Sequence, residues 1–111
     1  MIDIIIKNFL DTHLSVSSFL EKKGKIPLSY VLFEKTGSSK SNHLLSSTFA
    51  FQSYAPSMYE AAKLNEKLKE VVEQLIELNE ISNVSLNSDY NFTDTETKEY
   101  RYQAVFDINH Y

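Results

Sequence analysis

Apolar positions recur at steps of three and four along residues 57–78, which is the spacing of one face of a helix. They are Ala61, Leu64, Leu68, Val71, Leu75 and Leu78. Lysines and glutamates fill the positions between them and suit a solvated face. Ser57 and Glu60 follow Pro56 as a capping box, a pair that can satisfy free backbone N–H groups at a helix start. The pattern predicts a long amphipathic helix that must lie against other elements.

The first residues of the chain show the same period over a shorter length. Their apolar-face positions are Ile2, Ile5, Ile6, Phe9, Leu10 and His13, with Asp3, Lys7 and Asp11 opposite. This spacing predicts a helix at about residues 2–13. Because β-branched isoleucines lower helix propensity, we expect tertiary packing to hold this helix in place.

Three strand-like segments lie between the two predicted helices. Residues 16–21 are short and predict an edge strand. Residues 28–35 carry apolar side chains on both parities, which predicts a central strand buried on both sides. The polar, glycine-containing residues 36–42 predict a mobile loop, and residues 44–54 predict the next strand. Residues 28–54 are therefore expected to form a long hairpin.

Two alternating segments follow the long helix. Val84, Leu86, Tyr90 and Phe92 share one parity of the first segment, and Tyr100, Tyr102, Ala104, Phe106 and Ile108 share one parity of the second. The polar residues 94–98 between the segments predict a hairpin loop. The aromatic side chains on the apolar parity are assigned to core packing under a helix. Exposure of the tyrosines at an interface is the alternative.

The predicted elements follow one another in the order α-β-β-β-α-β-β. Strands with one apolar and one polar face belong to a sheet that is covered on one side, and the two helices are the available cover. We therefore predict an α+β fold. It is a single domain over residues 1–111, with an antiparallel or mixed sheet of about five strands and both helices packed on one face.

Composition narrows the classes of function. The chain has 111 residues, 42% of them hydrophobic, no cysteine and a formal net charge of −4. No apolar run is long enough to span a membrane, and the N-terminus lacks a signal-peptide cleavage site. We expect a soluble protein of a reducing compartment without disulfides. Because no basic stripe is present, direct nucleic-acid binding is disfavoured.

Candidate catalytic and ligand-binding motifs are weak. Lys40 and Ser41 end a GSSKS segment, but it lacks the second glycine and the following helix of a phosphate-binding loop. The three histidines, His13, His43 and His110, lack zinc-pair spacing, apart from the step from Asp107 to His110 at a strand end.

The acidic side chains of the last hairpin could suggest a cation site. They are Asp89, Asp94, Glu96, Glu99 and Asp107. No glycine follows Gly37 to make the sharp turn of a calcium loop, and no serine lies in a glycine-flanked elbow. The sequence therefore predicts neither an enzyme, nor a cofactor, nor a metal site.

Three segments resemble a known family when they are compared as text. They are PLSYVLFEKTG at 27–37, FAFQSYAPSMYEAAKLNEKLKE at 49–70 and LNEISNVSLNSDYNFTDTETKEYRYQAVFDI at 78–108. Together they resemble the tail terminator, or tail-to-head joining, proteins of long, non-contractile-tailed phages that infect Gram-positive bacteria. The hairpin SDYNFTDTETKEYRYQAVFDI is the most specific part of the resemblance.

The resemblance implies a structural virion protein without catalysis or cofactor. Such a protein is made in the host cytoplasm and caps the head-proximal end of the tail tube as a ring, commonly of six copies. Its partners would be further copies of itself, the tail tube protein and the head connector, and DNA would pass through the lumen. The candidate lumen-facing or partner-facing residues are Thr36, Gly37, Ser38, Ser39, Lys40, Ser41, Asn42, Asp94, Thr95, Glu96, Thr97 and Lys98.

Two alternatives stay open at this point. One is a head-side adaptor or other head-completion protein of the neck, which would differ in the partner that it contacts. The other is a small phage-encoded enzyme or regulator, for which the sequence offers only Lys40, Ser41 and the acidic hairpin. Small α+β folds serve many roles, so the fold alone does not decide between them.

Overall fold

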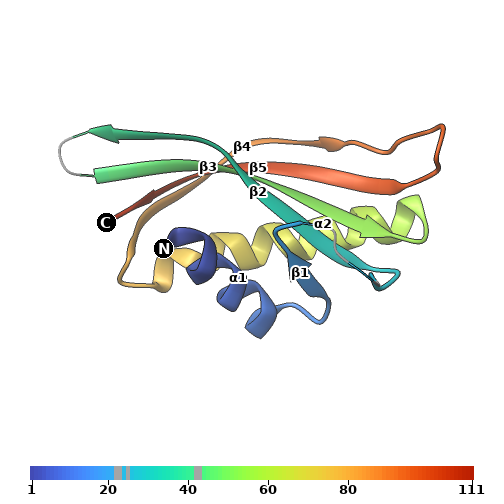
Figure 1. Ribbon diagram of the computed structural model, residues 1–111, viewed down its shortest axis with the longest axis horizontal. Helices are drawn as coiled ribbons and strands as arrows, with labels where there is room; N and C mark the ends of the chain where they lie inside the picture. Colours follow the sequence, from blue (N-terminus) through green and yellow to red (C-terminus); the bar gives the residue numbers. More distant parts are fainter. Residues whose placement is uncertain (22–23, 25, 42–43) are drawn as a thin grey trace.

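The computed structural model describes residues 1–21, 24, 26–41 and 44–111. In chain order, its elements are α1 (Ile2–His13), β1 (Ser17–Phe19), β2 (Tyr30–Ser41), β3 (Leu44–Ala55), α2 (Met58–Glu73), the short 3-10 helix η1 (Gln74–Glu77), β4 (Ile81–Asn91) and β5 (Tyr100–His110). Both helices lie on one face of a single sheet (Figure 1). This arrangement confirms the predicted α+β fold and its element order.

The five strands are arranged in the order β1-β2-β3-β5-β4. β1 pairs with β2 in parallel, as a short edge strand, and every other neighbouring pair is antiparallel. β3 therefore lies in the middle of the sheet, with β5 beside it. No helix among the described residues covers the opposite face of the sheet, and we call this face the open face.

The prediction that residues 28–35 form a central strand buried on both sides is wrong. β2 lies second from the edge, and β1 pairs only with its residues 30–32. Val31 and Phe33 are buried toward the helices, whereas Glu34 is exposed on the open face. The apolar side chain of Tyr30 lies on the opposite face of the strand from Val31 and Phe33. It stacks on Tyr54 of β3, with ring centroids 4.6 Å apart.

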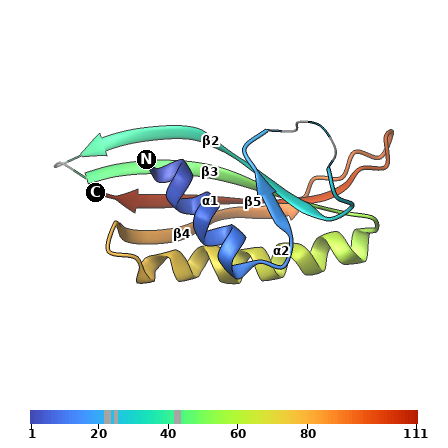
Figure 2. The same ribbon diagram turned by 60° about the horizontal axis from the view of Figure 1, so that its bottom comes forward.

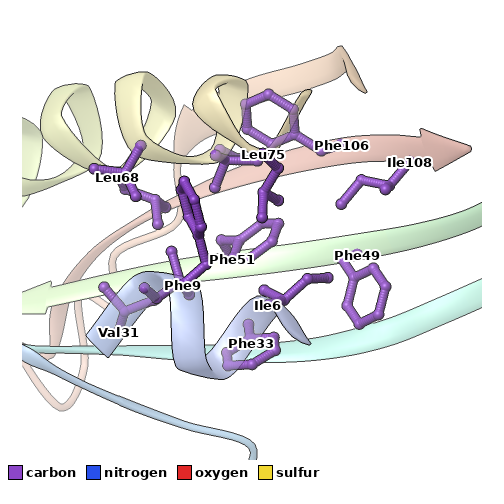
Figure 3. Close-up of a cluster of buried hydrophobic side chains, with 14 of the residues drawn as sticks. Ile6, Phe9, Val31, Phe33, Phe49, Phe51, Leu68, Leu75, Phe106 and Ile108 are labelled. Carbon is purple, nitrogen blue, oxygen red and sulfur yellow. The ribbon is translucent and has the colours of Figure 1, made fainter. Parts of the chain in front are cut away.

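The core lies between the sheet and the two helices. α2 runs along β3 and β5, and α1 crosses the same face beside it (Figure 2). Figure 3 shows side chains from both helices pointing toward the phenylalanines of the sheet. The largest fully buried side chains are Phe33, Phe49, Phe51, Phe106, Ile6, Leu10, Leu68, Leu75, Ile108, Val31, Val71 and Val72.

α2 begins where the capping box predicted. Ser57 is its N-cap, and the Ser57 hydroxyl accepts a hydrogen bond from the Glu60 backbone N–H at 3.2 Å. The Glu60 carboxylate lies 3.3 Å from the same hydroxyl. The α-helix ends at Glu73, and the 3-10 helix η1 continues from Gln74 to Glu77. The helical segment therefore ends one residue before the predicted Leu78, and its last turn is 3-10 helix.

The predicted mobile loop at residues 36–42 is also wrong in the described part of the chain. Residues 36–41 belong to β2 and pair with β3, from Gly37 opposite Thr48 to Ser41 opposite Leu44. Asn42 lies outside the described residues. The segment is polar because this end of the hairpin extends beyond the helices, and a strand that pairs through its backbone needs no buried side chains there.

β4 departs from the simple alternation that the sequence suggested. Leu86 pairs with Phe106, but the next pairs are Ser88 with Val105 and Asp89 with Ala104, so the register shifts by one residue. One extra residue moves every later side chain to the other face. Tyr90 and Phe92 therefore lie on the open face, and their assignment to the core is wrong.

Candidate interaction surface

The open face carries connected aromatic and polar side chains from β3, β4 and β5. Arg101 stands at one end of this network. Its Nε donates to the Phe92 carbonyl at 2.8 Å, and its Nη1 donates to the Tyr54 hydroxyl at 3.1 Å. The guanidinium also lies over the Phe92 ring, 4.7 Å from its centroid. Arg101 is thus fixed against two aromatic rings with its charge toward the open face.

An amide ladder continues the network across the middle of the open face. Gln52 of β3 donates to the side-chain oxygen of Gln103 of β5 at 2.8 Å, and Gln103 donates to the Tyr90 hydroxyl of β4. Tyr54 donates to Gln52 at 3.0 Å. Three strands are therefore linked by side chains as well as by backbone pairing. Such side-chain networks hold a surface in one arrangement.

The other end of the open face is acidic. Asp107 of β5 accepts hydrogen bonds from Thr48 at 2.7 Å and from Asn87 at 3.1 Å. Asp107 lies six residues beyond Arg101 on the same strand and the same face, about 20 Å away at the usual rise of a strand. The open face thus has a positive end and a negative end.

The two edges of the sheet differ from each other. β4 forms one edge over its whole length, with register shifts between Ile81 and Asn83 and between Leu86 and Ser88. The other edge is made by β1 only beside residues 30–32 of β2, so residues 33–41 of β2 form the edge themselves. Bulges and lysines on edge strands limit uncontrolled strand pairing.

The free end of the β2–β3 hairpin is the arm, which we define as residues 37–41 and 44–48. Arm residues Ser38, Ser39, Lys40, Leu45 and Ser47 line a shallow pocket of about 300 Å³ with Lys35 and His110. Ser47 and His110 are buried, and the Ser47 hydroxyl lies 2.9 Å from Nε2 of His110. Burial lowers the pKa of His110, and the positive charges of Lys35 and the N-terminus lower it further.

The second group of predicted partner-facing residues forms the tight turn of the β4–β5 hairpin, as predicted. The Asp94 carboxylate accepts from the backbone N–H groups of Glu96 at 3.0 Å and Thr97 at 3.4 Å. These bonds hold the pKa of Asp94 below its usual value. Lys98 adopts a positive φ of 58°. This turn and the arm lie at opposite ends of the molecule, so the structure does not bring the two groups together (Figure 1).

A polar cluster under α2 has no counterpart in the sequence predictions. Asn65 is buried on the sheet-facing side of α2 and donates to the Asp89 carboxylate at 2.7 Å. Lys69 forms an ion pair with the other oxygen of Asp89, and this bond raises the pKa of Lys69. The register shift in β4 turns Asp89 toward α2. The sequence signal for this cluster is Asn65 itself, a polar residue among the apolar positions of the helix.

The acidic residues of the last hairpin are dispersed. Asp89 contacts α2, Asp94 caps the turn and Asp107 lies on the open face. Within residues 1–21, 24, 26–41 and 44–111, no three acidic, histidine or cysteine side chains are grouped as a metal ion would require. His13 ends α1, with its Nδ1 2.9 Å from the Phe9 carbonyl, while His43 lies outside the described residues.

Among the described residues, no helix combines the length and apolar character needed to cross a membrane.

The comparisons with known proteins assign no family to this chain. Compared with protein-family models and with curated proteins, the sequence matches none.

Proposed function

We propose that this chain is a structural subunit of a phage tail that caps the head-proximal end of the tail tube as a ring and joins the tail to the head. The observation that carries the proposal is the pair of unlike sheet edges, β4 on one side and residues 33–41 of β2 on the other. A ring needs two different, complementary surfaces on each subunit. Two unlike strand edges on opposite sides of one sheet meet that requirement.

The strand directions support such a contact. β2, β3, β5 and β4 are each antiparallel to the next, so β4 runs opposite to β2. A second copy in the same orientation, placed beside β4, would therefore present its β2 in the antiparallel direction. Antiparallel pairing of this kind supplies main-chain hydrogen bonds between chains. A rotation between successive copies would close the array into a ring.

The two hairpin ends supply the surfaces that such a ring would offer to its partners. The arm projects at one end of the elongated molecule, which measures 44 × 24 × 24 Å, and the 94–98 turn projects at the other. We assign these ends to the tail tube protein, the head connector and the lumen through which DNA passes. The subunit needs no cofactor for this role and would reside at the head-tail junction of the virion.

The experiment that tests the proposal is binding to isolated tails. Purified protein is added to tails that lack this subunit, and electron microscopy records the position of the added density. We expect a ring at the head-proximal tube end, together with restored joining to heads. Binding to the portal or adaptor complex of heads, with none to tails, would overturn the terminator role and favour a head-side adaptor.

A further inference from the structure

The residue types on the open face differ from those on the other exposed surfaces. Among the strand residues of the open face that the structure describes, the charged side chains are Glu34, Arg101 and Asp107, and none is a lysine. The outer surface of α2, in contrast, interleaves lysines and glutamates. Interfaces are enriched in Tyr, Phe and Arg and depleted of Lys and Glu. The aromatic residues, the arginine and the lack of lysine among the described strand residues of the open face match that bias, whereas its serines do not.

Two aromatic side chains of the open face remain accessible. Tyr90 is 42% exposed and Phe92 is 39% exposed, and their rings meet edge to face at 5.8 Å between centroids. Val105 lies half-buried on the same face of β5, opposite Ser88 of β4. Rigid aromatic side chains of this kind provide most of the binding energy where they are covered by a partner. A partner on this face would bury apolar surface at its centre.

Arg101 and Asp107 are placed so that a second copy of the same chain can pair with both of them. Arg101 and Asp107 lie on β5 at equal distances along the strand from Ala104, and Gln103 and Val105 lie symmetrically between them. We propose that a second copy of this chain docks face to face on the open face. Its two-fold axis would run between the two sheets and cross the strands at the level of Ala104. That operation sets Arg101 of each copy opposite Asp107 of the other.

Arg101 and Asp107 can each form further hydrogen bonds with a second copy. The contacts described above engage one Nε–H and one Nη1–H of Arg101, and a guanidinium carries five N–H donors. Each carboxylate oxygen of Asp107 accepts one described bond, from Thr48 or Asn87, and has a second lone pair. Packed sheets lie about 10 Å apart, a gap that an arginine and an aspartate side chain together can span.

This dimer goes beyond the proposed function and does not rest on it. The open face and the two sheet edges are separate surfaces, so face-to-face pairing leaves β4 and the outer edge of β2 available. The contact is isologous, with the same patch used on both copies, whereas ring closure uses two different patches. The two contacts can therefore be tested separately.

The test uses Arg101→Asp and Asp107→Arg, with light scattering after size-exclusion chromatography across a concentration series. We expect the unaltered protein to dimerise and each variant alone to dimerise at least tenfold more weakly, because like charges would face each other twice. Mixing the two variants in equal amounts should restore the dimer, since both charge pairs in the mixed dimer are of opposite sign. A monomeric unaltered protein, unchanged single variants or no recovery on mixing would overturn the proposal.

Two further variants keep the result interpretable. Glu70→Arg, on the exposed face of α2, makes a charge change of the same size as Asp107→Arg away from the open face, and it should leave the dimer unchanged. If circular dichroism shows that Asp107→Arg fails to fold, Val105→Arg takes its place, because it sets like charges beside the two-fold axis and should weaken the dimer at least tenfold. A dimer unaffected by Val105→Arg would also overturn the proposal. Tail-end binding is not measured in this experiment, so failure of the dimer leaves the proposed function untouched.

Discussion

His110 links the stability of the fold to pH through the burial of one imidazole. Its pKa is lowered from the model-peptide value of 6.5, chiefly by burial. The unfolded chain therefore binds a proton at higher pH than the folded chain, and protonation favours unfolding. The stabilising effect is complete above pH 6.5 and is lost as the pH falls through the lower pKa of the folded state.

The corresponding prediction concerns His110→Gln, in which the amide can still bond to Ser47. We expect the free energy of unfolding, measured by urea denaturation between pH 8 and pH 5, to fall less steeply with decreasing pH in this variant than in the unaltered protein. His13→Gln, at the exposed end of α1, is the matched variant for the loss of a histidine elsewhere in the chain. Equal slopes for His110→Gln and the unaltered protein would show that His110 does not carry the effect.

Asp89 supports a buried amide as well as an exposed ion pair. Asp89→Ala removes the acceptor of the Asn65 amide, which is buried beneath α2. A buried donor left without a partner costs about 1–3 kcal/mol, and we expect thermal and urea denaturation to show a loss of that size. Glu66→Ala is the matched control, because Glu66 also contacts Lys69, at 2.9 Å, but its side chain is 71% exposed. Its loss should cost about 0.5 kcal/mol or less.

Residue-scale predictions from the sequence succeeded where the signal was local. The Ser57 cap depends on Glu60, three residues away, and both positions were identified. The Ser47–His110 pair joins residues 63 positions apart, and the Asn65–Asp89 pair joins two elements across a register shift. No spacing rule connects such residues, because the tertiary fold alone brings them together.

At the scale of the element, α2 depends on its first turn. Ser57→Ala removes the acceptor for the Glu60 backbone N–H and should cost about 1 kcal/mol. We expect this loss in urea denaturation, with Ser57→Asp restoring most of the stability because aspartate also caps helices. Ser15→Ala, an exposed serine outside the helices and strands, serves as the control and should change little. A Ser57→Ala variant as stable as Ser15→Ala would refute the role of the cap.

Strand predictions failed where backbone pairing overrode the side-chain pattern. β2 continues through polar residues because β3 pairs with it, and β4 reverses its alternation after Leu86 because one extra residue enters the strand. Hydrophobic periodicity reports burial, and neither the arm nor the end of β4 is buried by the helices. The long amphipathic helix was predicted well because one face of it is buried along its entire length.

At the scale of the whole molecule, the two layers, a sheet and two helices on one face of it, could be predicted from the apolar faces of the elements. The order of the strands within the sheet could not. Two helices and five strands with one covered face leave several possible orders, and the sequence contains no signal for placing β5 between β3 and β4. This placement makes β4 an edge and puts Arg101 and Asp107 on an inner strand, toward opposite ends of the open face. Both proposed contacts therefore depend on topology.

The arm provides the last test, because it contributes to an edge but little to the core. We expect that replacing residues 39–46 by Asn-Gly, which closes the hairpin at the Ser38–Ser47 pair, leaves the fold intact. The side chains of Ser39, Lys40, Leu44, Leu45 and Ser46 are exposed or half-buried, and Ser47 is kept for His110. The free energy of unfolding should therefore change by about 1 kcal/mol or less.

Tail-end binding should respond differently to the same change. The shortened β2 loses part of the edge that we assign to the neighbouring subunit, so electron microscopy of isolated tails should show capping reduced at least tenfold. A chain with residues 95–97 replaced by Gly-Ser-Gly is the control for altering a hairpin end elsewhere, because the 94–98 turn lies outside both sheet edges. It should still form the ring, although contacts with partners at that end would weaken. If the arm variant is folded and caps tails as well as the unaltered protein, ring closure does not use residues 39–41 of this edge.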